Sequence, residues 1–154
     1  MGEPVPDLGE LAGAVAGAMA QRAAGALADA GFTDVREPHE LVVRSLTAGD
    51  TRVTELAARL RVSPQAVSKT VAELVRAGYV TRGHDARDQR ARPLVMTERG
   101  QALVDASRRA RQAAVREVSR WLGARDTAEL VRLLERAAEP FGDAQATRRT
   151  GMRL

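Results

Sequence analysis

The chain has 154 residues, of which 44% are hydrophobic, 29% are charged and only 3% are aromatic, and its net charge is +4. A chain of this length can bury a core without disulfides or metals, and its alanine-rich, aromatic-poor apolar set favours helices. The lack of cysteine excludes disulfide bonds, thiolate metal sites and cysteine-based redox switches.

The N-terminal region predicts a helix rather than a targeting segment. Its apolar stretch, residues 11–20, follows acidic residues and is too short and too rich in glycine to be a secretory signal or a membrane span. We therefore expect a cytoplasmic protein with no membrane partner. Asp7 and Glu10 have the spacing of a capping box, and apolar residues recur at helical intervals up to Gly31. A second, short helix is expected from Pro38 onward.

Two further helices are predicted on either side of a short turn. The first is capped by Thr54 and follows a short extended piece at 51–53. Ser63 is a strong N-cap residue for the second, and Pro64 suits its first helical position. We expect this second helix to end just before Gly78.

The C-terminal half predicts a hairpin followed by two helices. Residues 79–82 and 94–96 are prone to form strands, and a polar, charged link joins them. Thr97 is placed to cap a long helix with an apolar stripe, and another helix is expected over 126–138. We expect the polar, basic tail 143–154 to be disordered.

The two central helices form a helix-turn-helix pattern. Their inner faces and the turn between them carry apolar residues: Leu56, Ala57, Leu60, Val62, Val67, Val71 and Leu74. The outer side of the second helix keeps Gln65, Ser68 and Lys69 near its N-terminus. These residue types suit base edges and phosphates.

Positive charge is concentrated in the same region. Between residues 52 and 99, ten basic residues stand against five acidic ones, so the segment carries +5 while the rest of the chain is about neutral. Such a segment is typical of a protein that binds a polyanion, although a solvated, arginine-rich face has the same composition. Arg87, Arg90 and Arg92 lie at or near the predicted hairpin tip, where a cationic ribbon suits a minor groove. Taken alone, this tip is equally compatible with a charged loop held by weak ion pairs.

Several segments resemble one family of regulators. They are Val-Ser-Pro-Gln-Ala-Val-Ser-Lys at 62–69, Ala-Gly-Tyr-Val at 77–80, Asp-Ala-Arg-Asp-Gln-Arg at 85–90 and Leu-Val-Met-Thr-Glu-Arg-Gly at 94–100. In these segments the chain resembles the multiple-antibiotic-resistance regulator (MarR) family, whose wing carries an Asp-x-Arg-Asp-x-Arg pattern. The motifs cover about residues 50–105, and the order of the helices extends the resemblance to nearly the whole chain.

The resemblance implies a mainly α fold with a small β-hairpin wing, built as one domain over residues 1–154. Residues 7–31 and 97–139 are the implied dimerisation helices, and 38–96 is the implied winged helix-turn-helix lobe. A homodimer of this kind is a sequence-specific regulator, commonly a repressor, that binds double-stranded DNA at a pseudo-palindromic operator. The DNA-binding residues carried over are Ser63, Gln65, Ser68 and Lys69 in the second helix of the motif and Arg87 and Arg90 in the wing. A small-molecule effector pocket between the dimer helices and the DNA-binding lobe is also implied.

Three features depart from the family pattern. Arg61 stands where such turns commonly carry glycine, which costs roughly 1 kcal/mol if the backbone is left-handed there. Pro93 interrupts the return strand of the hairpin and shortens the wing. The lack of cysteine excludes the peroxide-sensing mechanism of some relatives.

Other classes of function find little support in the sequence. His39 and His84 are the only histidines and are far apart, so we expect neither a metal site nor a cofactor. No glycine-rich phosphate loop and no nucleophile elbow is present, so we expect no enzyme activity. Two alternatives stay open: a winged-helix module that binds proteins instead of DNA, and a DNA-binding protein without sequence preference.

Overall fold

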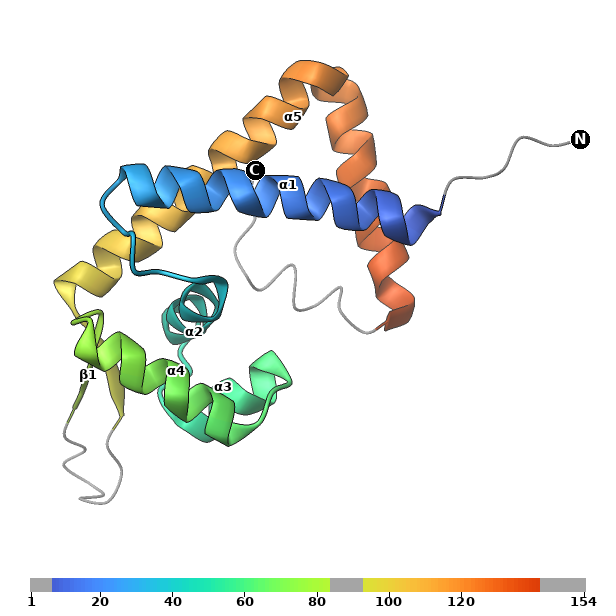
Figure 1. Cartoon of the computed structure of the whole chain (residues 1–154). Coiled ribbons are helices and arrows are strands. Elements are labelled where there is room, and N and C mark those ends of the chain that lie inside the picture. The colour runs from blue at the N-terminus through green and yellow to red at the C-terminus, as the bar shows by residue number, and fades with distance from the viewer. Residues whose placement is uncertain (1–6, 84–92, 142–154) are drawn as a thin grey trace, which may run out of the picture.

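The computed structural model describes residues 7–83 and 93–141. Its elements follow the predicted order and confirm a mainly α fold with a small hairpin (Figure 1). They are α1 (Leu8–Asp29), α2 (Glu37–Thr47), α3 (Val53–Leu60), α4 (Pro64–Arg76), β1 (Val80–Arg82), β2 (Leu94–Met96), α5 (Glu98–Ala138) and the 3-10 turn η1 (Glu139–Phe141). The tail for which we expect disorder, 143–154, lies outside the described residues.

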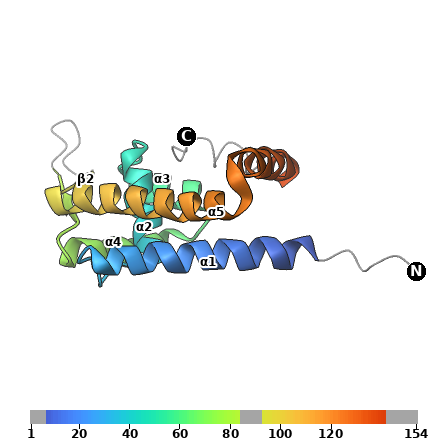
Figure 2. The same ribbon diagram turned by 90° about the horizontal axis from the view of Figure 1, so that it is seen from above.

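Helix α1 runs alongside the first part of α5 in the opposite direction, as both views show (Figures 1 and 2). Arg22 of α1 forms an ion pair with Glu117 of α5 across this contact. Helices α2, α3 and α4 and the hairpin form a separate lobe on one side of the pair. Helix α5 bends at Gly123, whose φ is 81°, so the expected break between two C-terminal helices is present but falls ahead of the predicted start at Asp126.

Side-chain caps fix the starts of three helices as the sequence predicts. The Asp7 carboxylate accepts hydrogen bonds from the backbone of Gly9 (2.7 Å) and Glu10 (3.0 Å). Ser63 and Thr97 likewise accept from the backbone N–H three residues on. The predicted cap at Thr54 is wrong, because α3 begins two residues earlier, at Val53, with Arg52 as N-cap. There the Glu55 carboxylate accepts from the Arg52 N–H at 2.9 Å and anchors the helix start.

The hairpin is short. Its antiparallel register pairs Val80 with Met96 and Arg82 with Leu94, and Pro93 lies just outside the ladder, as expected for a residue without an N–H. The extended piece predicted at 51–53 forms no strand. It still contributes one bond to the sheet, because the Thr51 carbonyl accepts from the Leu94 N–H at 2.9 Å.

The core joins the helix-turn-helix to the long helices. The predicted inner faces of α3 and α4 are buried, with Leu56, Val71 and Leu74 at 0% exposure. Val62, the apolar residue of the turn, is not buried between the two helices as its position predicts, since its side chain is 47% exposed. Burying these aliphatic side chains supplies most of the stability of the lobe, at about 1.5–3 kcal/mol each.

Two long-helix segments carry exposed apolar side chains. These are Leu8, Leu11 and Val15 in the first half of α1 and Trp121, Leu122, Leu133 and Leu134 in the second half of α5. Over the described ranges, no helix is both long and apolar enough to span a bilayer.

Candidate nucleic-acid interface

The outer face of α4 is polar and accessible. Gln65, Ser68 and Lys69 are all exposed, and their spacing of three and four residues places them on one side of the helix. Ser63, at the N-cap, is exposed as well, and its Oγ accepts from the Ala66 N–H at 3.2 Å. Its hydroxyl proton remains available for a phosphate or a base. The structure thus brings together the four residues that the sequence singled out in this helix.

The sharp turn before α4 sets the angle of the helix-turn-helix. Arg61 adopts the left-handed conformation, with φ 54° and ψ 41°, and ends α3. This is the strained geometry that the sequence raised as a departure from glycine. Its cost of roughly 1 kcal/mol is offset by the buried contacts of α3 with α4.

The wing extends from the end of the same helix. Figure 1 shows β1 following the C-terminal end of α4, with the hairpin directed away from α1 and α5. The proposed wing residues Arg87 and Arg90, together with Arg92 and His84, lie outside the described residues.

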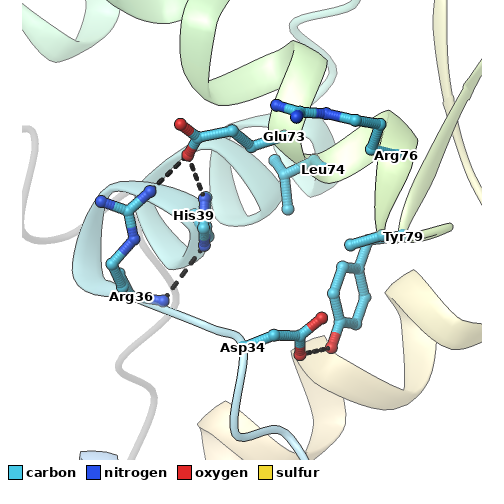
Figure 3. A pocket seen from close by; sticks show the side chains of 8 residues that line it. Asp34, Arg36, His39, Glu73, Leu74, Arg76 and Tyr79 are labelled. Atoms are coloured by element: carbon cyan, nitrogen blue, oxygen red, sulfur yellow. Dashed lines mark hydrogen bonds and ion pairs between the residues drawn. The ribbon is translucent and has the colours of Figure 1, made fainter.

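A polar cluster around Glu73, one turn beyond Lys69 on α4, was not predicted. The buried His39 donates from Nε2 to the Glu73 carboxylate at 2.9 Å, while its Nδ1 accepts from the Arg36 N–H at 3.1 Å. The Arg36 guanidinium also pairs with Glu73 (Figure 3). The hydrogen bond from His39, aided by the charge of Arg36, lowers the pKa of Glu73. Both nitrogens of the His39 ring therefore have hydrogen-bond partners, which fits a structural role.

This cluster borders a cavity of about 500 Å³ between α4 and the connection from α1 to α2. Its lining combines an apolar floor with charged rims and consists of Asp34, Arg36, His39, Glu73, Leu74, Arg76, Ala77 and Tyr79. Sequence reasoning missed the cavity because its walls are about 40 residues apart in the chain. The one local feature of the sequence that pointed to this site was a single histidine, His39, near the start of a helix.

A second unpredicted feature lies between α2 and α5. Arg111 is half-buried, and burial together with the nearby charge of Arg44 lowers its pKa. It donates to Glu40 at 3.4 Å. Among the residues that the structure describes, the buried Arg44 Nε and Ser107 Oγ have no hydrogen-bond partner. The contact between the lobe and the long helix is therefore incompletely satisfied.

A two-helix motif with a polar outer face, a following hairpin and long flanking helices define a winged helix-turn-helix protein. The model of the MarR family matches residues 40–91. The MarR family protein Rv2887 of Mycobacterium tuberculosis, in complex with DNA, is 28% identical and superposes with a TM-score of 0.69, covering 86% of this chain and 98% of that one. The same protein in complex with salicylic acid gives 0.67 at 28% identity, covering 87% and 98%.

The reduced form of MarR from E. coli has the same fold, with a TM-score of 0.73 at 23% identity over 88% of this chain and 98% of that one. A comparison with curated protein sequences gives no match. The chain is similar to the MarR family, by sequence in its central segment and by fold over most of its length.

Proposed function

We propose that the protein is a homodimeric, ligand-responsive repressor that binds a pseudo-palindromic operator. The observation that carries this proposal is the exposed row of Gln65, Ser68 and Lys69 on the second helix of the motif. Exposed polar side chains in the first two turns of such a helix reach base edges when it enters a major groove. The DNA complex of Rv2887, a protein of the same fold, supports this use of the surface.

The DNA contacts divide between the helix and the wing. Ser63 and Lys69 contact phosphates or bases at the N-terminal end of α4, while Gln65 and Ser68 read base edges. Arg87 and Arg90 of the wing enter the adjacent minor groove, whose negative potential favours arginine. Phosphate contacts supply much of the affinity, so binding weakens steeply with salt.

The exposed apolar surface supports a homodimer. Leu8 is 73% exposed in α1 and Trp121 is 85% exposed in α5, and each lies among other accessible apolar residues. Such contiguous apolar surface marks an interface. A second copy of the chain, related by twofold symmetry, buries these segments against its own. Dimer symmetry then places the half-sites about 10 bp apart, centre to centre. Binding to chromosomal DNA places the protein in the cytoplasm.

The effector is a small molecule held between α4 and the connection from α1 to α2. The cavity of about 500 Å³ has a suitable volume and an apolar floor with a few polar groups. The salicylic acid complex of Rv2887 supports a small organic effector. A molecule in this cavity presses against α4 near Glu73 and shifts the recognition helix, so that both copies no longer fit their half-sites.

Selection of DNA from a genomic fragment pool at near-physiological salt tests the proposal. Recovery of an inverted repeat with half-sites one helical turn apart is the expected result. Enrichment without a motif points to a DNA-binding protein without sequence preference, and no enrichment points to a protein-interaction module. The effector part fails if no small molecule changes the affinity for the recovered operator.

A further inference from the structure

Tyr79 lies three residues after the end of α4, the proposed recognition helix, and its backbone is hydrogen-bonded to the start of α5. Its carbonyl oxygen accepts from the N–H of Thr97, the N-cap residue of α5, at 3.1 Å. The Thr97 hydroxyl donates to the neighbouring Gly78 carbonyl at 2.6 Å and lies 3.0 Å from the Tyr79 oxygen. Gly100, one turn into α5, allows this approach, because a Cβ at that position would lie 2.1 Å from the same oxygen. The end of the recognition helix therefore rests on the first turn of a long helix.

The side chain of Tyr79 makes a second tie to the connection between α1 and α2. The ring is buried, and its hydroxyl donates to Asp34 Oδ1 at 2.6 Å (Figure 3). Arg99 of α5 donates to the same hydroxyl at 3.1 Å, and its guanidinium carbon lies 4.5 Å from the ring centroid. The Phe32 ring completes the packing, with its centroid 6.2 Å from that of Tyr79. The connection between α1 and α2 and the start of α5 thus both contact Tyr79, just after the end of α4.

These hydrogen bonds persist around neutral pH. Burial, followed by the bond to Asp34, raises the pKa of Tyr79, so its hydroxyl keeps the proton that it donates. The bond from Tyr79 is the main cause that lowers the pKa of Asp34, which stays a charged acceptor. At 2.6 Å, the Tyr79–Asp34 bond is shorter than the 3.4 Å contact between Arg111 and Glu40, which links the lobe to α5.

We infer that Tyr79 is a positioning residue for DNA binding, whose hydroxyl bond to Asp34 sets the angle of α4 relative to the α1–α5 pair. Helix α4 has 13 residues and is therefore about 20 Å long. A rotation of about 10° at its C-terminal end displaces the base-reading N-terminal end by roughly 3 Å, about the rise of one base pair in a duplex. The inference rests on the proposed dimeric function, since an angle of this kind matters only when two recognition helices must fit one operator.

The test measures how strongly the operator affinity of each variant depends on the spacing between the two half-sites. The affinity for the recovered operator is divided by the affinity for the same operator with one base pair inserted between its half-sites. We expect a ratio of about tenfold or more for the wild type, and a ratio at least about threefold smaller for Tyr79→Phe and for Asp34→Ala. Tyr79→Phe keeps the buried ring, and Asp34→Ala changes a half-exposed side chain, so both variants retain the core.

Both substitutions remove the Tyr79–Asp34 hydrogen bond, and each also removes one contact with Arg99, so the loss of spacing discrimination in the double variant should be smaller than the product of the two single losses. Asp105→Asn is the matched control, since its contact with Arg108 stays within α5, and its ratio should equal that of the wild type. Loss of stability alone lowers the affinity for both operators equally and leaves the ratio unchanged. Unchanged ratios in both single variants, or losses that multiply in the double variant, overturn the inference. A wild type without spacing preference overturns the proposed dimeric function, and the inference with it.

Discussion

Gly100 lies directly against the backbone of Tyr79, so close that a Cβ on Gly100 would come within 2.1 Å of the Tyr79 carbonyl oxygen and 2.6 Å of the Met96 side chain. A backbone atom cannot yield as a flexible side chain does. The contact therefore requires glycine inside a helix, where this residue ordinarily costs about 1 kcal/mol relative to alanine.

Gly100→Ala should destabilise the protein by roughly 3 kcal/mol or more, since it drives α5 away from the end of the recognition helix. The measurement is the free energy of unfolding by urea. Gly25→Ala is the matched control, because a Cβ at that position in α1 meets no atom within 4 Å. This control should instead stabilise the protein by about 0.5–1 kcal/mol. Equal effects of the two substitutions would contradict the close contact.

Glu73→Gln should lower stability at neutral pH and have less effect in acid. His39, Arg36 and Lys69 hold the pKa of Glu73 below its ordinary value of 4.5. The stabilisation is therefore complete above pH 4.5 and is lost as the pH falls through the lowered pKa of the folded protein. Urea unfolding of both proteins at neutral pH and at about pH 3.5 measures this difference. A gap in stability that is the same at both pH values would show that the charge of Glu73 contributes nothing.

Arg87→Ala should weaken operator binding by about 1–3 kcal/mol, roughly ten- to a hundredfold, while leaving the unfolding temperature unchanged. The reason is the proposed loss of an arginine from the minor groove. Titration of labelled operator at moderate salt measures the effect. Arg108→Ala is the control, since this exposed arginine pairs with Asp105 within α5 and lies outside both the lobe and the apolar segment assigned to the dimer interface. If Arg87→Ala and Arg90→Ala both bind like the control, the wing assignment is wrong.

The sequence predicted the parts of the fold that depend on local signals. Ser63, Thr97 and the apolar spacing of α4 and α5 placed the helices correctly, because caps and helical periodicity act over a few residues. The cap of α3 was misplaced because the Glu55 carboxylate, and not Thr54, holds its first turn. The exposed polar residues of α4 that we propose to face DNA followed from the same short-range pattern.

The contacts that Glu73 and Tyr79 make with residues 34–39 could not be predicted from the sequence. Glu73 pairs with residues 34 and 37 positions away, and Tyr79 bonds to a carboxylate 45 positions away. No local rule links such partners, since they meet only after the connection between α1 and α2 folds back onto α4. The cavity lies between them and was hidden for the same reason.

Ser107→Ala should stabilise the protein by about 1 kcal/mol, an unusual sign for a core substitution. The residue is 3% exposed, and within the described part of the chain its hydroxyl has no hydrogen-bond partner. Removing the hydroxyl relieves a buried, unsatisfied group and improves helix propensity. Ser119→Ala, in the same helix but only half-buried, should gain less than about 0.5 kcal/mol. Thermal unfolding compares them, and a destabilised Ser107→Ala would mean that the hydroxyl has a partner after all.

Trp121→Ala should convert much of the protein from dimer to monomer at micromolar concentration. The indole is 85% exposed in the single chain and lies in the apolar segment assigned to the dimer interface. A buried interface tryptophan commonly contributes 2 kcal/mol or more, so the dimer dissociation constant should rise by about thirtyfold or more. Sedimentation equilibrium measures this constant. Val95→Ala is the control, because Val95 is 45% exposed but lies on the hairpin. If neither substitution changes the constant, Trp121 is outside the interface, and the exposed face of α5 must serve another contact.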